Sequence, residues 1–543
     1  MLQSSRVYVS GMIAERRSPF NHVALRRVVP LEAVENHGPF PYDVQALPPE
    51  ASACRESMKI LLLFPPQAQI VTPGYMRTIQ EGLGYLPPLG LLYLAAYLLE
   101  HTRHEVEVLD AHVEAMDFAA VEAHVRRSRP DAVGVTAMTF TLVDALDAAR
   151  AVKRVDPSIP VILGGPHTAL FPVESVEQPD IDYVVLGEGE IPLARLLDRL
   201  EEKGHLPGRP WRREDGSLAG ESVVADLPSV RDKLSTGHSS RYQVADLDAL
   251  PVPRRDLVPY HRYSTVVSKQ PPTTTLLSSR GCPYACSFCY TAGGKKVRTR
   301  SPRGVVDEMR SATELGIHEF LFFDETFTID RARVVAICEE IIRQGIQVSW
   351  DVRARVDCVD RDLLALMRKA GCGRVQYGIE AGTQRVMDVL LKGITLDQAR
   401  DAIRWTREAG LATYGDFLIG APGETRDEML QTLGFARSLR LDYVHFSILV
   451  ILPSTPLHRS AVQKGLIDDE TWRAFARDPR PGFQVPHWTE VLTREELEDV
   501  VVRCLKSSYL RPGYVLRSLG QVHSFGELVR KARAGLKLAW MGL

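Results

Sequence analysis

The chain has 543 residues, of which 45% are hydrophobic and 25% are charged, a composition that excludes a disordered or fibrous protein and fits two or three globular domains. The formal net charge of −2 at pH 7 gives no general attraction to nucleic acid, and no nucleic-acid partner is expected. The longest apolar stretch, 86–99, is interrupted by prolines and is too short to span a bilayer, and no secretory pattern opens the sequence, so a cytoplasmic location is predicted.

Residues 1–57 are rich in arginine, proline and polar residues and show no sustained hydrophobic period. We therefore predict a poorly ordered extension. Met58 directly precedes the first strand-like run, 59–64, so a translation start at Met58 is an alternative to a start at Met1.

Short apolar runs alternate with helical patterns over 58–205, which predicts an α/β domain with a parallel sheet covered on both faces. The expected strands are 59–64, 105–109, 132–136, 160–163 and 183–186, and the expected helices are 89–100, 118–127, 143–154, 173–177 and 191–201. Ligands of such sheets bind at the carboxyl ends of the strands, where glycine lets a bulky ligand approach the backbone. The candidate ligand-binding residues there are Thr136, Thr139, Gly164, Gly165, His167 and Glu188.

Residues 206–270 carry many Pro, Asp, Arg and Ser residues and predict a connector with short elements near 247–253 and 257–263. The sequence leaves open whether this connector packs on the following domain or forms part of a substrate pocket.

Three cysteines, Cys282, Cys286 and Cys289, follow the strand-like run 273–279 on one short segment. Thiolates are preferred ligands of iron–sulfur clusters, and three of them can hold three irons of a four-iron cluster. A zinc knuckle would need a fourth ligand, and the next candidates, His318 and Cys338, lie far along the chain. A disulfide is not expected, and a buried structural group is less consistent with the neighbouring Gly281 and Pro283.

Six further strand–helix repeats over 271–460 predict a partial (β/α)6 barrel, followed by a helical region over 461–543. The expected strands are 273–279, 319–323, 347–352, 374–378, 412–418 and 443–449, and the expected helices are 302–315, 331–344, 361–370, 384–390, 396–409 and 426–439. Ser301, Asp330 and Asp360 stand where they would cap three of these helices. Barrel chemistry belongs at the carboxyl ends of the strands.

Charged residues stand at two of these strand ends. Asp324 and Glu325 end an apolar strand, where acids are costly unless they bind something. Arg353 and Arg355 follow the next strand, and guanidinium groups suit a carboxylate ligand, with structural salt bridges as the alternative.

Two basic segments each have a functional and a structural interpretation. The first follows the cysteines and consists of Lys295, Lys296, Arg298, Arg300 and Arg303. It could bind an anionic group of a substrate, although the pattern favours a solvated loop. The terminal segment 528–540 could lie on a membrane surface, although the pattern favours an ordinary exposed helix.

The motif Cys282-x3-Cys286-x2-Cys289, with the aromatic Phe288 before the third cysteine, resembles the radical S-adenosylmethionine (SAM) superfamily. The upstream segments 63–66, 163–167 and 187–190 resemble the cobalamin-binding, Rossmann-like domain of its cobalamin-dependent class. The resemblance implies three cofactors: a 4Fe-4S cluster, SAM chelated to its open iron, and cobalamin. It also implies that the reduced cluster cleaves SAM to a 5′-deoxyadenosyl radical.

The resemblance assigns roles to further residues. The segment 323–327 matches a family pattern whose two acids, here Asp324 and Glu325, face the SAM amino group, with Glu325 replacing the family's second Asp. Glu380, in a Gly-Ile-Glu motif where Ala381 replaces the family serine, would accept hydrogen bonds from the ribose. The SAM carboxylate is then the candidate ligand for the guanidinium group of Arg353. The turn 420–425 would leave room near adenine, with Glu424 as an acid at the start of the next helix.

Two histidines are candidates for cobalamin contacts. His112 lies in an Asp-x-His triplet like that of proteins whose histidine ligates cobalt, but the triplet follows the second strand and Ala115 replaces the family glycine. A polar loop histidine is the favoured interpretation, with cobalt left without a protein ligand. His167 is the better candidate for contacting the corrin or its nucleotide tail.

We therefore expect a radical enzyme in which methylcobalamin methylates an unactivated carbon of an unknown substrate, with flavodoxin or ferredoxin as electron donor. An oxidative cyclase like that of chlorophyll synthesis is the alternative within the family. A sensor or electron carrier without turnover is the alternative of another class. The methylthiotransferases are a poorer match, because their N-terminal domain has three further cysteines that this chain lacks.

Overall fold

The computed structural model describes residues 57–71, 84–203, 243–520, 522 and 525–540. All of them belong to one compact unit of the chain, Arg55–Leu543. The extension predicted over 1–57 lies almost wholly outside the described residues.

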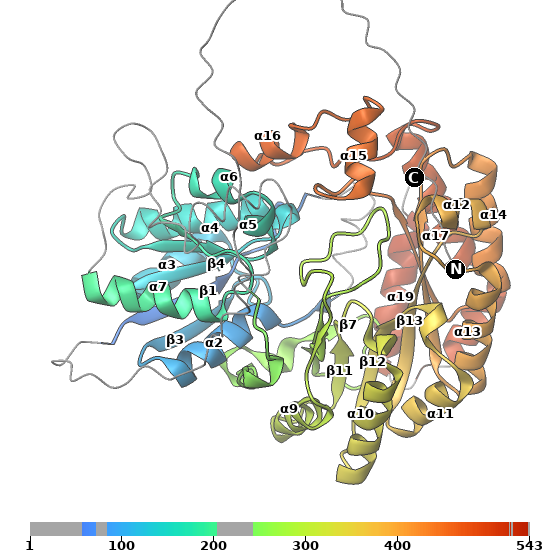
Figure 1. Ribbon diagram of the computed structural model, residues 1–543, viewed down its shortest axis with the longest axis horizontal. Coiled ribbons are helices and arrows are strands. Elements are labelled where there is room, and N and C mark those ends of the chain that lie inside the picture. The colour runs from blue at the N-terminus through green and yellow to red at the C-terminus, as the bar shows by residue number, and fades with distance from the viewer. Residues whose placement is uncertain (1–56, 72–83, 204–242, 521, 523–524, 541–543) are drawn as a thin grey trace, which may run out of the picture. The chain divides into compact units, whose positions relative to one another are not determined.

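The first region is a five-stranded parallel sheet in the order β3-β1-β4-β5-β6 (Figure 1). Its strands are β1 (Lys59–Phe64), β3 (Glu105–Asp110), β4 (Ala132–Thr136), β5 (Val161–Gly164) and β6 (Tyr183–Val184). Its long helices are α2 (Leu89–His101), α3 (Phe118–Ser128), α4 (Leu142–Val155) and α7 (Glu190–Lys203).

Alternation along β1 explains why both faces of this sheet are covered. Leu61 and Leu63 pack in the core that includes α3 and α4, whereas Ile60 and Leu62 pack in the core that includes α2 and α7. A strand buried on both faces reads as a continuous apolar run, which is why the sequence predicts it well. The single helix expected over 173–177 is instead a pair, α5 (Pro166–Leu170) and α6 (Pro172–Val176), each begun by a proline.

The second region is a six-stranded parallel sheet in the order β15-β14-β13-β12-β11-β8, curved into a partial barrel. Its strands are β8 (Thr273–Leu276), β11 (Glu319–Phe322), β12 (Ser349–Ala354), β13 (Cys372–Glu380), β14 (Ala412–Ile419) and β15 (Tyr443–Ile448). The helices between the strands are α9 (Pro302–Glu314), α10 (Arg331–Gln344), α11 (Arg361–Lys369), α12 (Gln384–Val389), α13 (Leu396–Glu408) and α14 (Arg426–Ser438). These outer helices are visible in Figure 1. The predicted fold class is confirmed.

The predicted caps are also confirmed. The side chains of Ser301, Asp330 and Asp360 each accept a hydrogen bond from the backbone N–H three residues further on. The core beneath the strands includes Phe322, Phe327 and Trp350, whose rings pack against one another.

The described part of the connector, 243–270, packs on the barrel. Its short elements are η3 (Leu247–Ala249), η4 (Arg255–Leu257), η5 (Tyr260–Arg262) and β7 (Ser264–Thr265). Arg255 is buried and donates to Glu308 of α9 at 2.5 Å and to Thr274 of β8 at 3.0 Å. β7 pairs with β2 (Gly84–Tyr85), which directly precedes α2 in the chain. The connector therefore holds the two regions together.

The last helices are α15 (Pro456–Gln463), α16 (Thr471–Arg477), α17 (Arg494–Tyr509), α18 (Pro512–Gly520) and α19 (Phe525–Trp540). The Tyr514 hydroxyl donates to the carbonyl of Asp442, and Arg530 donates to the carbonyl of Ser268, both at 2.8 Å. Asp442 directly precedes β15 and Ser268 shortly precedes β8, the two edge strands of the barrel sheet. α18 and α19 therefore lie near the amino-terminal ends of the edge strands. Within the described ranges, no helix is both long and apolar enough to cross a membrane.

Candidate cofactor site

The three cysteines lie on a loop between two short antiparallel strands, β9 (Ser279–Arg280) and β10 (Arg298–Thr299). Gly281 begins the loop with φ +100°, and a Cβ there would lie 2.3 Å from the Lys296 carbonyl, so this turn requires glycine. The Ser287 N–H donates to the Leu390 carbonyl at 3.0 Å and fastens the loop to the barrel. Cys282 and Cys286 are half-buried and Cys289 is exposed, as a loop that receives a cluster requires.

The three cysteines supply the ligand set of a cluster. Three thiolates on one loop can hold three irons of a four-iron cluster. Elsewhere among the described residues, one group alone brings three metal-ligating atoms within 4.8 Å of one another, namely His104, Asp198 and Glu201. In the histidine group, Arg103 already pairs with Glu201 at 2.7 Å.

The two acids after β11 take different positions. Asp324 is fully buried and accepts hydrogen bonds from the Ser278 N–H at 2.8 Å and from the hydroxyls of Ser278 and Ser279. Glu325 lies on the cavity side and accepts from the Gly281 N–H at 3.2 Å. Loss of hydration, reinforced by Asp324, raises the pKa of Glu325. Asp324 therefore fixes the strand end, and Glu325 is the acid of this pair that borders the cavity.

Arg353 and Arg355 also lie in different environments. Arg355 is buried, pairs with Asp357 at 2.9 Å and lies 3.7 Å from the centre of the Tyr284 ring in the cysteine loop. Arg353 is exposed over the ring of Phe323 at 4.5 Å, and within the described part of the chain no carboxylate forms a salt bridge with it. The structural alternative holds for Arg355, whereas Arg353 keeps its guanidinium available for an anionic ligand.

Glu380 sits at an irregularity of β13. The pairing register with β14 shifts between Gly378 and Glu380, and Glu380 itself has φ +73°, a strained value for a residue with a side chain. Its carboxylate pairs with Lys392 at 2.8 Å, and both side chains are at most 9% exposed. Burial lowers the pKa of Lys392, but the charge of Glu380 outweighs this and raises it. The sequence did not identify Lys392 as a site residue, because a single lysine after an apolar run belongs to no recognisable motif.

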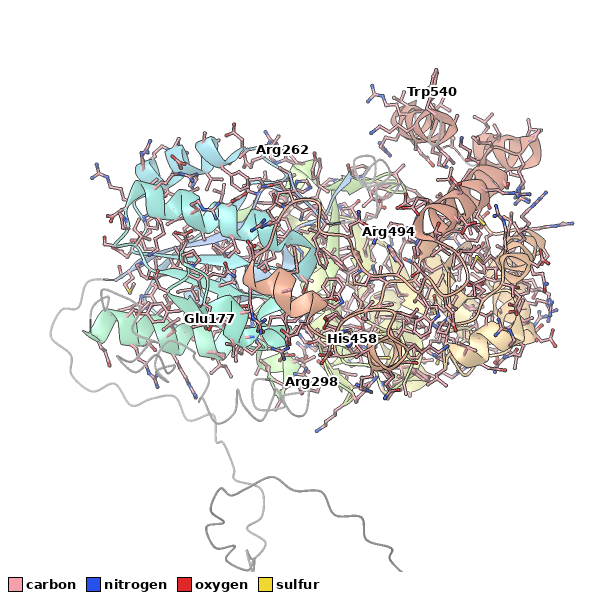
Figure 2. The ribbon with its side chains drawn as sticks, turned by 90° about the horizontal axis from the view of Figure 1, so that it is seen from above. Glu177, Arg262, Arg298, His458, Arg494 and Trp540 are labelled. Atoms are coloured by element: carbon pink, nitrogen blue, oxygen red, sulfur yellow. The ribbon has the colours of Figure 1, made fainter. Side chains whose placement is uncertain are left out.

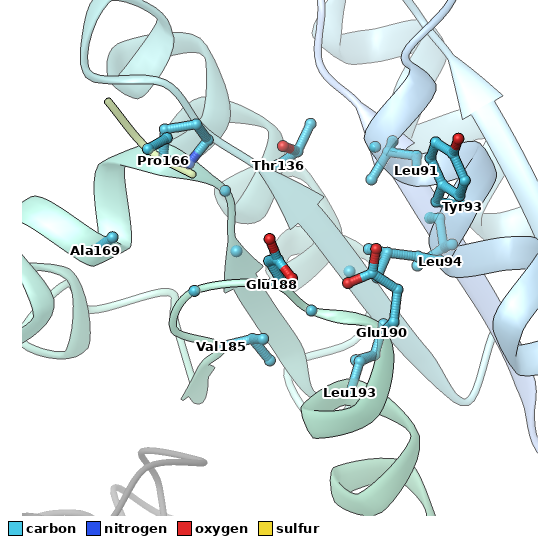
Figure 3. Close-up of a pocket in the computed structure, with 18 of the residues that line it drawn as sticks. Leu91, Tyr93, Leu94, Thr136, Pro166, Ala169, Val185, Glu188, Glu190 and Leu193 are labelled. Atoms are coloured by element: carbon cyan, nitrogen blue, oxygen red, sulfur yellow. The ribbon is translucent and has the colours of Figure 1, made fainter. Parts of the chain in front are cut away.

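A cavity of about 350 Å³ lies between the first sheet and the cysteine loop. Figure 3 shows its sheet-side wall. One wall is formed by the carboxyl ends of β4 and β5, the loop after β6, and α2. The other wall is formed by Arg280, Ala292, Gly293, Phe323 and Glu325. Five of the sequence candidates line this cavity: Thr136, Gly164, Gly165, Glu188 and Glu325.

Two glycines of the first wall, Gly90 and Gly164, leave it open. A Cβ at Gly90 would meet nothing within 4 Å, and a Cβ at Gly164 would meet only Val185, at 3.9 Å. The volume falls in the usual range of ligand pockets and takes part of a cofactor as large as cobalamin. These residues therefore fit the cofactor that the sequence suggests, with glycine backbone facing it and the carboxylates of Glu188 and Glu190 paired with arginines.

Thr139 and His167 are not in the cavity lining but contact each other behind it. The His167 Nδ1 lies 3.1 Å from the Thr139 hydroxyl, and its buried Nε2 has no hydrogen-bond partner among the described residues. Burial lowers the pKa of His167 to about 3, so the ring is neutral at physiological pH. His112 also lies outside the lining, packed edge-on against Tyr85 at 4.9 Å.

Glu188 joins the loop after β6 to the cysteine loop. It pairs with Arg298 at 2.6 Å and with Arg280 at 3.2 Å, and Glu190 pairs with Arg280 at 2.8 Å. Figure 3 shows Glu188 and Glu190 following one another on this loop. We call these four residues the interdomain ion cluster. All four side chains are at most 15% exposed, so the two acids and two arginines neutralise each other away from water.

The interpretation of the basic run as a solvated or substrate-binding loop is wrong for two of its members. Arg298 and Arg300 are buried, because Glu188 and Glu308 respectively supply a carboxylate for each. Lys295 and Lys296 are exposed.

The role expected for Glu424 is also corrected. Thr425 caps α14, and its own N–H donates to the Glu428 carboxylate at 3.0 Å, so Glu428 is an acid at the helix start. Glu424 is buried and folds back onto the turn, accepting from the N–H groups of Gly420 and Ala421 at 2.8 and 2.9 Å. Burial raises the pKa of Glu424 to about 7.

Comparisons with known proteins agree with this arrangement. A family model described as B12 binding domain matches residues 79–197, and one described as Radical SAM superfamily matches residues 276–436. An uncharacterised methyltransferase of Pyrococcus horikoshii is 31% identical over 88% of this chain and 98% of its own length. The anaerobic magnesium-protoporphyrin IX monomethyl ester cyclase of Rubrivivax gelatinosus is 29% identical over 73% of this chain and 70% of its own.

A solved structure has the same fold. The radical S-adenosylmethionine methyltransferase TsrM from Kitasatospora setae, with cobalamin and a [4Fe-4S] cluster bound, superposes with a TM-score of 0.64 at 21% identity. The match covers 88% of this chain and 99% of that chain.

Proposed function

Because the chain belongs to the cobalamin-dependent radical SAM superfamily, we propose that it is a methyltransferase acting on an unactivated carbon of a small-molecule substrate. The Pyrococcus relative, which matches over nearly its whole length, is named a methyltransferase, and this name supports methyl transfer over other radical reactions.

The enzyme's cofactors are a 4Fe-4S cluster, SAM and cobalamin. When bound, they supply reductive cleavage of SAM and delivery of a methyl group. Within the proposal, Cys282, Cys286 and Cys289 hold the cluster. Arg353 and Glu325 bind the charged ends of SAM, and the ion pair of Glu380 with Lys392 places a carboxylate beside its ribose.

The single observation that carries the proposal is the position of the cavity. Its walls come from both the glycine-rich sheet end and the base of the cysteine loop, so the space proposed for cobalamin adjoins the proposed cluster site. A methyl acceptor bound between the two cofactors would be reachable from each side. A sensor or electron carrier needs no such shared space.

The first experiment is anaerobic purification with hydroxocobalamin, followed by metal counting and turnover with SAM carrying a deuterated methyl group. We expect about four irons and one cobalt per chain, 5′-deoxyadenosine, and deuterium in a product drawn from a metabolite extract of the source cells. Iron and cobalt without any cleavage of SAM would contradict the enzyme proposal and favour a carrier.

An oxidative cyclase is the second candidate, supported by the cyclase relatives that match much of this chain. The same labelling experiment separates the two. A cyclase would form 5′-deoxyadenosine and an oxidised product that contains no deuterated methyl group.

We also propose that an acidic flavodoxin or ferredoxin supplies the electron. The exposed Cys289 lies on the same loop as the exposed Lys295 and Lys296. These lysines give an anionic electron donor a basic surface to bind near the proposed cluster. Replacing Lys296 with Glu should slow reduction by flavodoxin but not by dithionite.

A further inference from the structure

The exposed apolar side chains of this protein concentrate in its last helices. Thirteen large hydrophobic side chains are exposed among the described residues, and six of them lie between Leu510 and Trp540. The three most exposed are also here: Trp540 at 73%, Leu516 at 71% and Leu536 at 63%. Single exposed apolar residues are ordinary, but such a concentration marks an interaction surface.

Five of these six side chains belong to α18 and α19, and Leu510 directly follows α17. Leu536 and Trp540 are four positions apart in α19, and Leu516 and Leu519 are three positions apart in α18, so each pair shares a helix face. On the inner side of α19, Leu538 packs against the barrel core. Figure 2 shows Trp540 at the margin of the molecule, on the end of α19.

The charge of the same helices is strongly positive. Residues 510–540 carry six basic residues, namely Arg511, Arg517, Arg530, Lys531, Arg533 and Lys537. The acid described among them, Glu527, is buried and paired with Lys531 at 2.7 Å. The exposed Arg533 and Lys537 flank the Leu536–Trp540 face. The whole chain, in contrast, has a net charge of −2.

We propose that α18 and α19 form a docking surface for an anionic phospholipid bilayer. Apolar side chains with a tryptophan on one face and basic residues beside them are what an interfacial helix presents to acyl chains and anionic headgroups. A bilayer surface supplies both a negative potential and an apolar layer. The docking is peripheral, since no described helix is fit to span a membrane. The surface lies near the amino-terminal ends of the edge strands, whereas the cofactor cavity adjoins the other end of the barrel.

The proposal is tested by sedimentation of the full-length holoenzyme with vesicles. Vesicles of phosphatidylcholine alone are compared with vesicles that also contain phosphatidylglycerol, at low and high salt. We expect binding to the anionic vesicles, loss of binding as salt rises, and little binding to phosphatidylcholine. The double variant Leu536→Glu/Trp540→Glu should bind at least tenfold more weakly, and Arg533→Gln about fivefold more weakly.

Ile342→Glu is the matched control, because Ile342 is an exposed apolar residue on α10, 38% exposed and outside this surface. It should bind like the unmodified chain. Circular dichroism and iron content show that each variant is folded. The proposal fails if the folded protein does not bind anionic vesicles or binds phosphatidylcholine vesicles equally well. It also fails if Ile342→Glu weakens vesicle binding as much as the double variant does. Concentration-dependent dimers that the double variant abolishes would also overturn it, in favour of a second copy as the partner.

Discussion

The two walls of the cavity solve the problem of binding a cofactor in different ways. The sheet wall is shaped by missing side chains: Gly90 and Gly164 leave open space in front of the backbone. The barrel wall and the strand ends behind it depend on individual charged groups, most of them already paired, such as Glu380 with Lys392 and Arg355 with Asp357. A wall shaped by absent side chains accepts ligands of many chemical types, whereas a wall of charged groups accepts only ligands with complementary charge. We therefore expect cofactor binding at each wall to be lost independently of the other wall, and through different kinds of substitution.

Removing one thiol should have the largest effect and should be confined to the barrel side. Cys286→Ala leaves only two cluster ligands, so iron should fall from about four per chain to near zero and SAM cleavage should be lost, while cobalt is retained. Metal analysis of the purified protein checks this. Cys358→Ala is the control, because Cys358 is a half-buried cysteine near the loop, beside Tyr284, and should leave iron unchanged. Loss of cobalt together with iron would show that the walls are not independent.

Filling the sheet wall should produce the reverse pattern. Gly164→Leu would project a side chain into the cavity with little clash at its Cβ, so we expect cobalamin affinity to fall at least tenfold with iron unchanged. Equilibrium titration with hydroxocobalamin measures this. The same substitution at the exposed Gly434 of α14, where a Cβ also meets nothing within 4 Å, should have no effect on cobalamin. Normal affinity in Gly164→Leu would contradict the placement of cobalamin at this strand end.

Breaking a buried ion pair should cost stability as well as ligand binding. Glu380→Gln leaves the Lys392 ammonium buried without its anion, and we expect a loss of about 3 kcal/mol of unfolding free energy. Glu380→Gln/Lys392→Met should recover much of this loss but not the affinity for SAM. Urea unfolding and SAM titration of both variants test the expectation. Equal stability in the single and double variants would mean that the pair is solvated.

The smallest effect should appear in the pH dependence of stability. The pKa of Glu424 is raised by burial to about 7 in the folded chain, above its ordinary value of 4.5. The folded state then holds the proton more tightly, so Glu424 stabilises the fold below pH 4.5 and this contribution declines as the pH rises toward 7. Glu424→Gln should flatten stability over this window by up to about 3 kcal/mol, measured by urea unfolding.

His167 contributes with the opposite sign. Its folded pKa of about 3 lies below the ordinary value of 6.5, so its contribution is lost as the pH falls from 6.5 toward 3. A Glu424→Gln profile with an unchanged slope between pH 4.5 and 7 would contradict the assignment of that slope to Glu424.

The sequence predicted well what depends on local pattern. Apolar runs located β1 and the barrel strands, and short-range signals located the caps at Ser301, Asp330 and Asp360. The cysteine motif needed only its own spacing and the strand before it. For the charged residues of the barrel, the order of strands indicated which side chains share one end of the sheet. It did not indicate which ion-pair partner each side chain has.

The interdomain ion cluster could not be predicted in this way. Glu188 and Arg298 are 110 positions apart, and neither belongs to a periodic pattern. Glu188 was a reasonable cobalamin candidate because it ends a strand, and it does border the cavity, but its carboxylate is already engaged by two arginines. Likewise, Asp324 resembles Glu325 in the sequence, and only its contacts with two serines and Arg333 distinguish the buried acid from the one that borders the cavity.

Arg280 has a consequence for how the enzyme matures. It directly precedes Gly281 and Cys282, and its guanidinium is held by Glu188 and Glu190 of the first region. During synthesis the first region leaves the ribosome before the cysteines do, so the two carboxylates can be in place when the loop emerges. Cluster insertion would then occur on a loop already fastened at its base. A fragment that begins after the first region should load iron poorly, even though it contains every cluster ligand.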